Sequence, residues 1–209
     1  GGGFYINQSS PLIENCFIYE NDALDGGGIY IANSSSAVIR NCVINSNSNT
    51  GISLYQTESC RIIKCRIKDN QGESAGGIFL YSDSGTEIKN TLIRNNTATG
   101  GQWYYGAGGI LYRYSNSMNI ENSIIHNNTG STAGGIYLQG VQGGIISNCV
   151  ISENNGGYGG GLYTLTNTSP DITNTSFVRN ISNTNGGAMR LSTRANIDIA
   201  NCTLYGNIS

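Results

Sequence analysis

The sequence predicts an all-β fold in which the chain winds through eight coils of about 26 residues, with three short strands in each coil. The first observation is a motif of the form Ile-x-Asn-Cys-x-Ile-x-x-Asn, followed by Gly-Gly-Ile, that returns eight times. The second is that apolar residues alternate with a period of two inside each copy, as β-strands require. A repeat of this length, which buries its apolar face only against its neighbours, is typical of a solenoid. We therefore expect residues 1–209 to form one continuous parallel β-solenoid, as a segment of a longer chain or filament.

The copies align on the residue that follows the first Asn of the motif. Successive copies lie 26, 23, 26, 32, 26, 26 and 27 residues apart. These reference residues are Cys16, Cys42, Cys65, Thr91, Ser123, Cys149, Thr175 and Cys202. The first strand of a coil follows the Gly pair, as in residues 28–31. The second strand precedes the reference residue, and the third strand starts at it.

The second and third strands each place one large apolar residue per coil on the inner side. The column from the second strand is Ile13, Ile39, Ile62, Ile88, Ile120, Ile146, Ile172 and Ile199. The column from the third strand is Ile18, Ile44, Ile67, Ile93, Ile125, Ile151, Phe177 and Leu204. Because equivalent residues of stacked parallel strands point the same way, we expect these columns to form the core.

Two columns of Asn accompany the strands. The first precedes the reference residue in seven of eight copies, with Lys64 as the exception, at a bend where Asn tolerates the left-handed conformation. The second is complete and consists of Asn21, Asn47, Asn70, Asn96, Asn128, Asn154, Asn180 and Asn207. Stacked amides about 4.8 Å apart hydrogen-bond along a column, as in cross-β ladders. We interpret these Asn residues as structural.

Five of the six cysteines occupy the reference column, where Thr and Ser also occur, so the position favours a small side chain. Side chains on adjacent parallel coils point the same way, which does not favour a bond between stacked cysteines. We therefore expect buried free thiols. The alternative is a disulfide between Cys60 and Cys65, which are both expected to face inward on successive strands of one coil.

Charge and hydropathy limit the partners of the chain. The formal net charge is −2, and charged residues make up 11% of the sequence. Nucleic acid is not expected as a partner, because no basic stripe is present to neutralise phosphates. Apolar runs are only a few residues long, so no membrane span is expected. No Gly-Lys-Ser or Gly-Lys-Thr follows the Gly pairs, and the calcium-binding glycine repeat is absent, so we expect neither a cofactor nor a metal.

The carboxylates do not favour an enzyme. The 13 Asp and Glu residues scatter along the chain, whereas a glycosidase needs two carboxyls that flank the scissile bond. A lyase of the pectate type needs a cluster of Asp with a basic residue beside it. His126, the single histidine, falls on the outer side of a third strand and is interpreted as a surface residue. We therefore expect a protein without catalytic residues, with a polysaccharide lyase or glycosidase as the alternative.

Aromatic residues form the most distinctive outer surface. They fall at outward positions of the first strand and in an insertion, residues 100–106, that lengthens one repeat. The predicted aromatic face consists of Tyr5, Tyr30, Tyr55, Phe79, Tyr81, Trp103, Tyr104, Tyr105, Tyr137 and Tyr163. Tyr suits exposed strands, and stacked rings stabilise a ladder. Contiguous exposed rings also mark a contact surface for sugar or for another protein.

The repeats resemble those of right-handed parallel β-helix proteins. Residues 177–180, which read Phe-Val-Arg-Asn, are followed by Gly-Gly-Ala at 186–188, and this pairing resembles the repeats of polymorphic outer-membrane adhesins. The resemblance implies a right-handed, single-stranded β-helix and an extracellular or cell-surface location. Because this fold carries lyases, glycosidases and adhesins alike, the function has to come from sites.

The ends of the repeat array suggest assembly. No polar cap is recognisable at either end, and an uncapped coil exposes unpaired strand edges over an apolar core. End-to-end contacts that do not close into a ring give a filament. We therefore expect an extracellular structural solenoid that stacks head to tail on copies of itself or on flanking coils of the same chain. The aromatic face would serve lateral or glycan contacts, and the alternative is a carbohydrate-binding or carbohydrate-cleaving β-helix.

Overall fold

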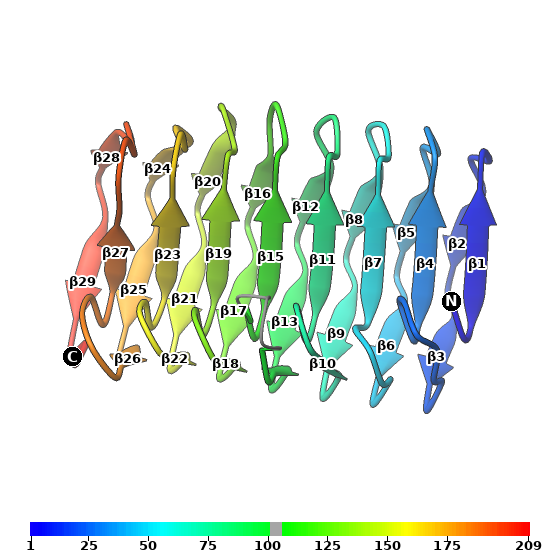
Figure 1. The fold of residues 1–209 in the computed structure, drawn as a ribbon, viewed down its shortest axis with the longest axis horizontal. Coiled ribbons are helices and arrows are strands. Elements are labelled where there is room, and N and C mark those ends of the chain that lie inside the picture. Colours follow the sequence, from blue (N-terminus) through cyan, green and yellow to red (C-terminus); the bar gives the residue numbers. More distant parts are fainter. Residues whose placement is uncertain (101–105) are drawn as a thin grey trace.

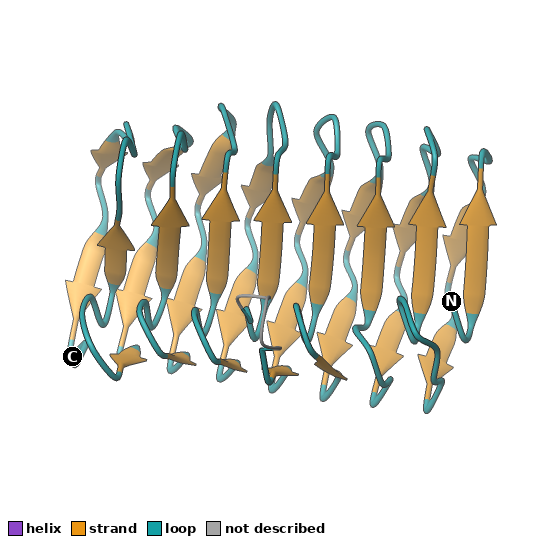
Figure 2. Ribbon diagram, viewed as in Figure 1, coloured by secondary structure: helices purple, strands orange, loops and turns teal. Residues whose placement is uncertain are grey.

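The chain forms a rod of eight stacked coils. The structure is a computed structural model and describes residues 1–100 and 106–209. The N-terminus and the C-terminus lie at opposite ends of the rod (Figure 1). Strands and loops account for the described residues, and no helix occurs among them (Figure 2). Accordingly, this part of the chain contains no helix that is long and apolar enough to cross a membrane.

Three parallel sheets of eight strands run the length of the rod, and each coil contributes one strand to each sheet. Sheet A contains β1 (Phe4–Asn7), β4 (Ile29–Ala32), β7 (Ile52–Tyr55), β11 (Ile78–Tyr81), β15 (Ile110–Arg113), β19 (Ile136–Gln139), β23 (Leu162–Leu165) and β27 (Met189–Leu191). Sheet B contains β2 (Leu12–Glu14), β5 (Val38–Arg40), β8 (Arg61–Ile63), β12 (Glu87–Lys89), β16 (Asn119–Glu121), β20 (Ile145–Ser147), β24 (Asp171–Thr173) and β28 (Ile199–Ala200). Sheet C contains β3 (Phe17–Tyr19), β6 (Val43–Asn45), β9 (Arg66–Lys68), β13 (Leu92–Arg94), β17 (Ile124–His126), β21 (Val150–Ser152), β25 (Ser176–Val178) and β29 (Thr203–Tyr205). The predicted all-β solenoid with three main strands per coil is therefore confirmed.

A fourth, shorter sheet was not predicted. Sheet D has five strands: β10 (Gln71–Gly72), β14 (Thr97–Ala98), β18 (Thr129–Gly130), β22 (Asn155–Gly156) and β26 (Ile181–Ser182). Its strands have two residues each and follow the Asn column directly. Gly, Asn and Thr at these positions resemble turn residues, so the sequence pattern does not distinguish such a strand from a loop.

The two predicted apolar columns fill the interior. The Ile of the second strand is buried from Ile13 to Ile172, and the third-strand column is buried from Ile18 to Phe177. In the last coil, Ile199 and Leu204 are 41% and 54% exposed, because no further coil packs on them. Burial inside the rod thus comes from the neighbouring coil, as a solenoid requires.

The Asn that precedes the reference residue makes the bend between sheets B and C. Asn15, Asn41 and their equivalents adopt φ values between 50° and 56°. Lys64, the exception in this column, adopts the same left-handed conformation at φ 54°. Asn is favoured there because its short polar side chain tolerates this region. Among the described residues, no side-chain hydrogen bond joins one Asn of this column to the next. The Nδ2 of Asn41 instead lies 3.5 Å from the carboxylate of Glu14.

The second Asn column is a continuous ladder. From Asn21 to Asn180, each side-chain Nδ2 donates to the Oδ1 of the equivalent Asn in the next coil at 2.9–3.0 Å. Between Asn47 and Asn207, the same Nδ2 also donates to a third-strand carbonyl of the preceding coil. The Oδ1 accepts a second bond from the backbone N–H of the preceding Asn, for example Asn128 N to Asn154 Oδ1 at 3.0 Å. Each interior amide therefore satisfies four hydrogen bonds.

All six cysteines are free thiols, including Cys60 and Cys65, so the alternative of a disulfide between these two is not realised. Cys60 Sγ donates to the carbonyl of Ser35 at 3.4 Å, and Cys65 Sγ donates to the carbonyl of Ile39 at 3.5 Å. Both thiols thus point at the preceding coil rather than at each other. Burial raises the pKa of Cys60, Cys65 and Cys149 to about 11.

The ladder predicts that replacing Asn154 lowers the free energy of unfolding far more than replacing the adjacent Asn155. Replacing Asn154 by Ala leaves Asn128 Nδ2, Ile125 O and Asn180 Oδ1 without their buried partner, which costs about 3 kcal/mol of unfolding free energy. Replacing the exposed Asn155 by Ala changes it by less than about 0.5 kcal/mol. Urea titrations of both variants measure this difference, and equal shifts would contradict a stabilising ladder.

The burial of the thiols predicts which cysteines react with an alkylating reagent and how the stability of the protein depends on pH. Native protein at about pH 8 should react with iodoacetamide at half-buried Cys16 and Cys202 but not at Cys60, Cys65 or Cys149. In the folded state the pKa of the Cys60, Cys65 and Cys149 thiols is about 11, above the ordinary value of 9.0. The contribution of these three thiols to the free energy of unfolding is therefore complete below about pH 9 and is lost as the pH rises toward 11. Intact mass after unfolding should show six alkylated thiols without reductant. A smaller number that reductant restores would reveal a disulfide.

Candidate functional site

The candidate site begins with a short coil. The repeat between Cys42 and Cys65 has 23 residues, three fewer than the common 26. The missing residues fall in the connection between β6 and β7, residues 46–51, whereas the connections of the adjacent coils span residues 20–28 and 69–77. Strand β7 pairs in register with β4 on one side and with β11 on the other. The longer connections, residues 20–28 and 69–77, therefore form two walls, and the short connection lies between them.

A small residue deepens the gap between the walls. The outward column of sheet A runs through Tyr5, Tyr30, Ser53 and Phe79 in register. Ser53 is the one member of this set without a ring, and it is the member that lies in the short coil. Together, the short connection and Ser53 leave a groove with a volume of about 850 Å³.

Five rings line the groove, and four of them are in contact with one another. These are Tyr30, Tyr55, Phe79, Tyr81 and Tyr114. Tyr55 and Tyr81 stack with centroids 5.1 Å apart and an interplanar angle of 5°. Tyr81 also meets Tyr114 edge to face at 5.5 Å and Phe79 at 6.4 Å. Tyr55, Phe79, Tyr81 and Tyr114 thus form one continuous, rigid surface, because each contact restricts the rotamer of its neighbour.

The short connection ties both walls of the groove. Asn49 Nδ2 donates to the carbonyl of Ala23 in one wall at 2.7 Å. Thr50 Oγ1 donates to the carbonyl of Ala75 in the other wall at 2.7 Å. Both residues have positive φ, 58° and 84°, which turns the connection sharply between the walls. The walls are therefore held in position before any ligand binds.

Charged and phenolic groups surround the rings. Asp25 lies in the first wall and Glu73 in the second, and neither forms an ion pair with the residues that the structure describes. Arg113 stacks over Tyr114 at 5.4 Å, and its Nε donates to Gln139 Oε1 at 2.9 Å. Burial, and then the nearby charge of Asp25, raise the pKa of Tyr30, which keeps this phenol protonated as a donor at neutral pH.

The predicted aromatic face is divided by the structure. Tyr30, Tyr55, Phe79 and Tyr81 meet at the groove. Tyr5 is exposed beside it and stacks on Tyr30 with centroids 5.6 Å apart. The predicted Trp103, Tyr104 and Tyr105 lie outside the residues that the structure describes.

Tyr137 and Tyr163, which were predicted to be exposed, are buried instead. They stack with centroids 5.2 Å apart inside a second apolar cluster with Ala75, Ala107, Leu111 and Ala133. The three Ala residues and Gly159 pair in a parallel column outside sheet A. This column and Leu111 thus pack against the rings and cover them. The sequence signal for this cover was the Ala-Gly-Gly triplet at residues 107–109 and 133–135, whereas the triplet at 75–77 lies in the second wall of the groove. The signals for the groove were the short repeat and Ser53.

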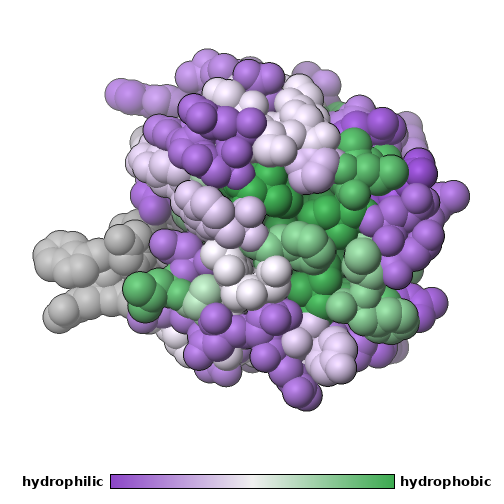
Figure 3. Space-filling model, turned by 90° about the vertical axis from the view of Figure 1, so that its right-hand side faces the viewer, coloured by the Kyte–Doolittle hydropathy of each residue, from purple (hydrophilic) through white to green (hydrophobic). Residues whose placement is uncertain are grey.

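The two end coils form a second candidate surface. Figure 3, which faces the N-terminal end, shows hydrophobic surface across its centre. At the C-terminal end, Leu191, Leu204 and Ile208 are exposed. The Asn ladder is also open there, since among the described residues Asn207 Nδ2 donates only to the carbonyl of Phe177. At the N-terminal end, the Oδ1 of Asn21 accepts no hydrogen bond from the residues described.

Comparison with known proteins agrees with the fold. The family model described as right handed beta helix region matches residues 1–110 and 92–209, which together span the chain. No curated protein and no solved structure matches the sequence. The chain therefore belongs to the right-handed β-helix family.

Proposed function

We propose that this chain is an extracellular structural β-solenoid that binds an extended glycan in the groove on sheet A. The observation that carries the proposal is the groove itself, in which five rings and several polar groups surround a volume of about 850 Å³. Ligand sites of about 300–1,000 Å³ are typically lined by aromatic residues with a few polar groups. The groove thus has the size of a ligand site.

Sugars suit this lining for a chemical reason. A pyranose ring has apolar C–H faces and a rim of hydroxyl groups, so it packs flat on an aromatic ring while its rim forms hydrogen bonds. One face of Tyr55 is covered by Tyr81, and its opposite face, which has no ring partner among the described residues, provides such a platform. Tyr30, Asp25 and Glu73 provide donors and acceptors at the edges. Because the groove crosses several coils, it accommodates a chain of sugars rather than a single one.

Filling the groove tests the proposal. Tyr at position 53 would restore the ring that neighbouring coils carry at this column, so Ser53→Tyr should preserve the fold and abolish binding. Tyr81→Ala removes the ring shared by three aromatic contacts and should weaken binding about tenfold. Glycan-array screening followed by calorimetry with the best oligosaccharide measures both effects.

The matched control lies away from the groove. Tyr19 is exposed on sheet C, so Tyr19→Ala removes one exposed ring without touching the groove and should leave the Kd unchanged. Thermal unfolding checks that each variant is folded. Glycan binding that survives Ser53→Tyr would contradict this site.

Cleavage of the bound glycan is the second candidate function. Asp25 and Glu73 are carboxylates on opposite walls of the groove, two coils apart, which is an axial rise of about 9.6 Å. Carboxyl groups about 6.5–9.5 Å apart serve inverting glycosidases. Release of reducing ends that disappears in both Asp25→Asn and Glu73→Gln would favour cleavage. Binding without product release favours the first proposal.

The structural part of the proposal rests on the end coils. We infer that further coils cover both ends, supplied by flanking sequence or by another copy of the chain in a filament or surface stalk. The open ladder supports this, because a stacked copy would bring its Asn21 Oδ1 to the free Nδ2 proton of Asn207 in the direction that the ladder already follows. The exposed Leu204 and Ile208 would be buried by the same contact.

Electron microscopy tests stacking between copies. Purified protein should form fibres with an axial repeat of about 38 Å, the length of eight coils. Leu204→Asp places a charge on the end face and should dissolve the fibres, whereas Ile124→Asp, on the side of the rod, should not. Single rods at every concentration would contradict stacking between copies.

A further inference from the structure

Charged side chains on sheet B are paired with the opposite charge in the next coil. Arg40 Nε lies 2.7 Å from Glu14, and Arg61 Nε lies 3.2 Å from Glu87, each pair in direct register. Lys89 Nζ contacts Glu121 at 3.5 Å in the same way. The outer surface of sheet B thus follows the rule that opposite charges stabilise a cross-strand pair.

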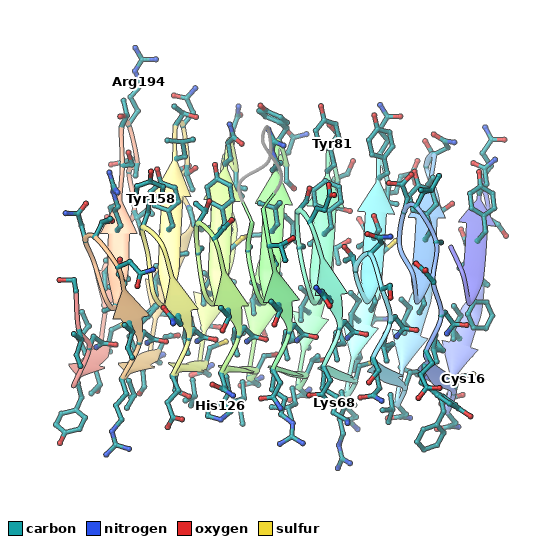
Figure 4. The ribbon with its side chains drawn as sticks, turned by 60° about the horizontal axis from the view of Figure 1, so that its bottom comes forward. Cys16, Lys68, Tyr81, His126, Tyr158 and Arg194 are labelled. Atoms are coloured by element: carbon teal, nitrogen blue, oxygen red, sulfur yellow. The ribbon has the colours of Figure 1, made fainter. Side chains whose placement is uncertain are left out.

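The outer surface of sheet C breaks this rule. Lys68 of β9 pairs in register with Arg94 of β13, and the next residue of that column is His126. Arg66 lies two residues before Lys68 and points to the same side of the strand. Figure 4 shows Lys68 and His126 projecting from the same side of the rod. Two cations therefore occupy neighbouring positions of one ladder, which is destabilising.

Nearby carboxylates neutralise little of this positive charge. Lys68 Nζ contacts Asp69 at 2.9 Å. Among the residues described, Arg66, Arg94 and the preceding Lys64 form no ion pair. The patch made by Lys64, Arg66, Lys68 and Arg94, here called the basic patch, thus combines four cations with one carboxylate on a chain whose formal net charge is −2. A local excess of one sign attracts a ligand of the opposite sign.

We propose that the basic patch binds an acidic polysaccharide, independently of the groove on sheet A. The β-lattice spaces cations about 4.8 Å apart across strands and about 7 Å along a strand, which suits the closely spaced carboxylates or sulfates of such a polymer. Half-buried Leu92 and exposed Ile124 lie beside the cations and offer apolar contact to sugar rings. Duplex nucleic acid fits less well, since its binding proteins commonly neutralise about 6–10 phosphates.

Binding is tested with polygalacturonate and heparin as probes, with dextran as the neutral control. Wild-type protein should bind both polyanions at low salt and not dextran. The double variant Arg66→Gln/Arg94→Gln should weaken binding at least about tenfold, and the slope of log K against log salt should fall by about 2. Its thermal midpoint should stay equal or rise, because Lys68 loses a like-charged neighbour.

The matched control changes the net charge equally on the other sheet. Arg40→Gln/Arg61→Gln removes two cations from sheet B, and binding should change less than about twofold. Equal losses in the two double variants would overturn the proposal, because binding would then depend on the total number of cations rather than on the basic patch. It would also be overturned if the wild-type protein bound neither polyanion, or if a DNA duplex bound more tightly than both through the same residues.

Discussion

The buried Asn ladder is the interaction on which the rest of the structure depends. Each interior amide satisfies four hydrogen bonds: two with the side chains of the neighbouring Asn residues, one with a backbone N–H of a neighbouring Asn, and one with a third-strand carbonyl. A slip of one residue between coils would leave these buried groups unpaired and would turn the Ile columns outward. The ladder therefore holds register at one corner of every coil, and the stacked side chains on all sheets follow from it.

With register held in this way, the length of the connections becomes the variable that shapes the surface. Removing three residues between β6 and β7 opens a groove, because the connections on either side keep their length and the sheet beneath does not move. Further along the rod, Ala107, Leu111 and Ala133 instead pack with Tyr137 and Tyr163 in a second apolar cluster. The same outward column of sheet A is thus open in one part of the rod and covered in another.

The contrast between repeated strand positions and variable connections explains which features could be predicted from the sequence. Columns such as Ile13 to Ile172 were predictable because each position repeats and its environment is the same residue in the next coil. The burial of Tyr137 was not, because it depends on the path of a connection rather than on the strand that carries the ring. The thiols of Cys60 and Cys65 illustrate the same limit, since both face inward as expected but point to different carbonyls of the preceding coil.

In such a rod, a residue that differs from the rest of its column indicates function more clearly than the residues that repeat. A solenoid places equivalent residues about 4.8 Å apart, so every outer position is a one-dimensional array in which neighbours must be compatible. Ser53 interrupts a row of rings, and Lys68 faces Arg94 where the other sheet places opposite charges. Neither departure stabilises the stack, because one removes a ring contact and the other sets like charges side by side. Surfaces that reduce stability without serving the fold are where contacts with other molecules are expected. Ser53 lies on coil 3 of the rod and the Lys68–Arg94 pair on coils 3 and 4, on different sheets.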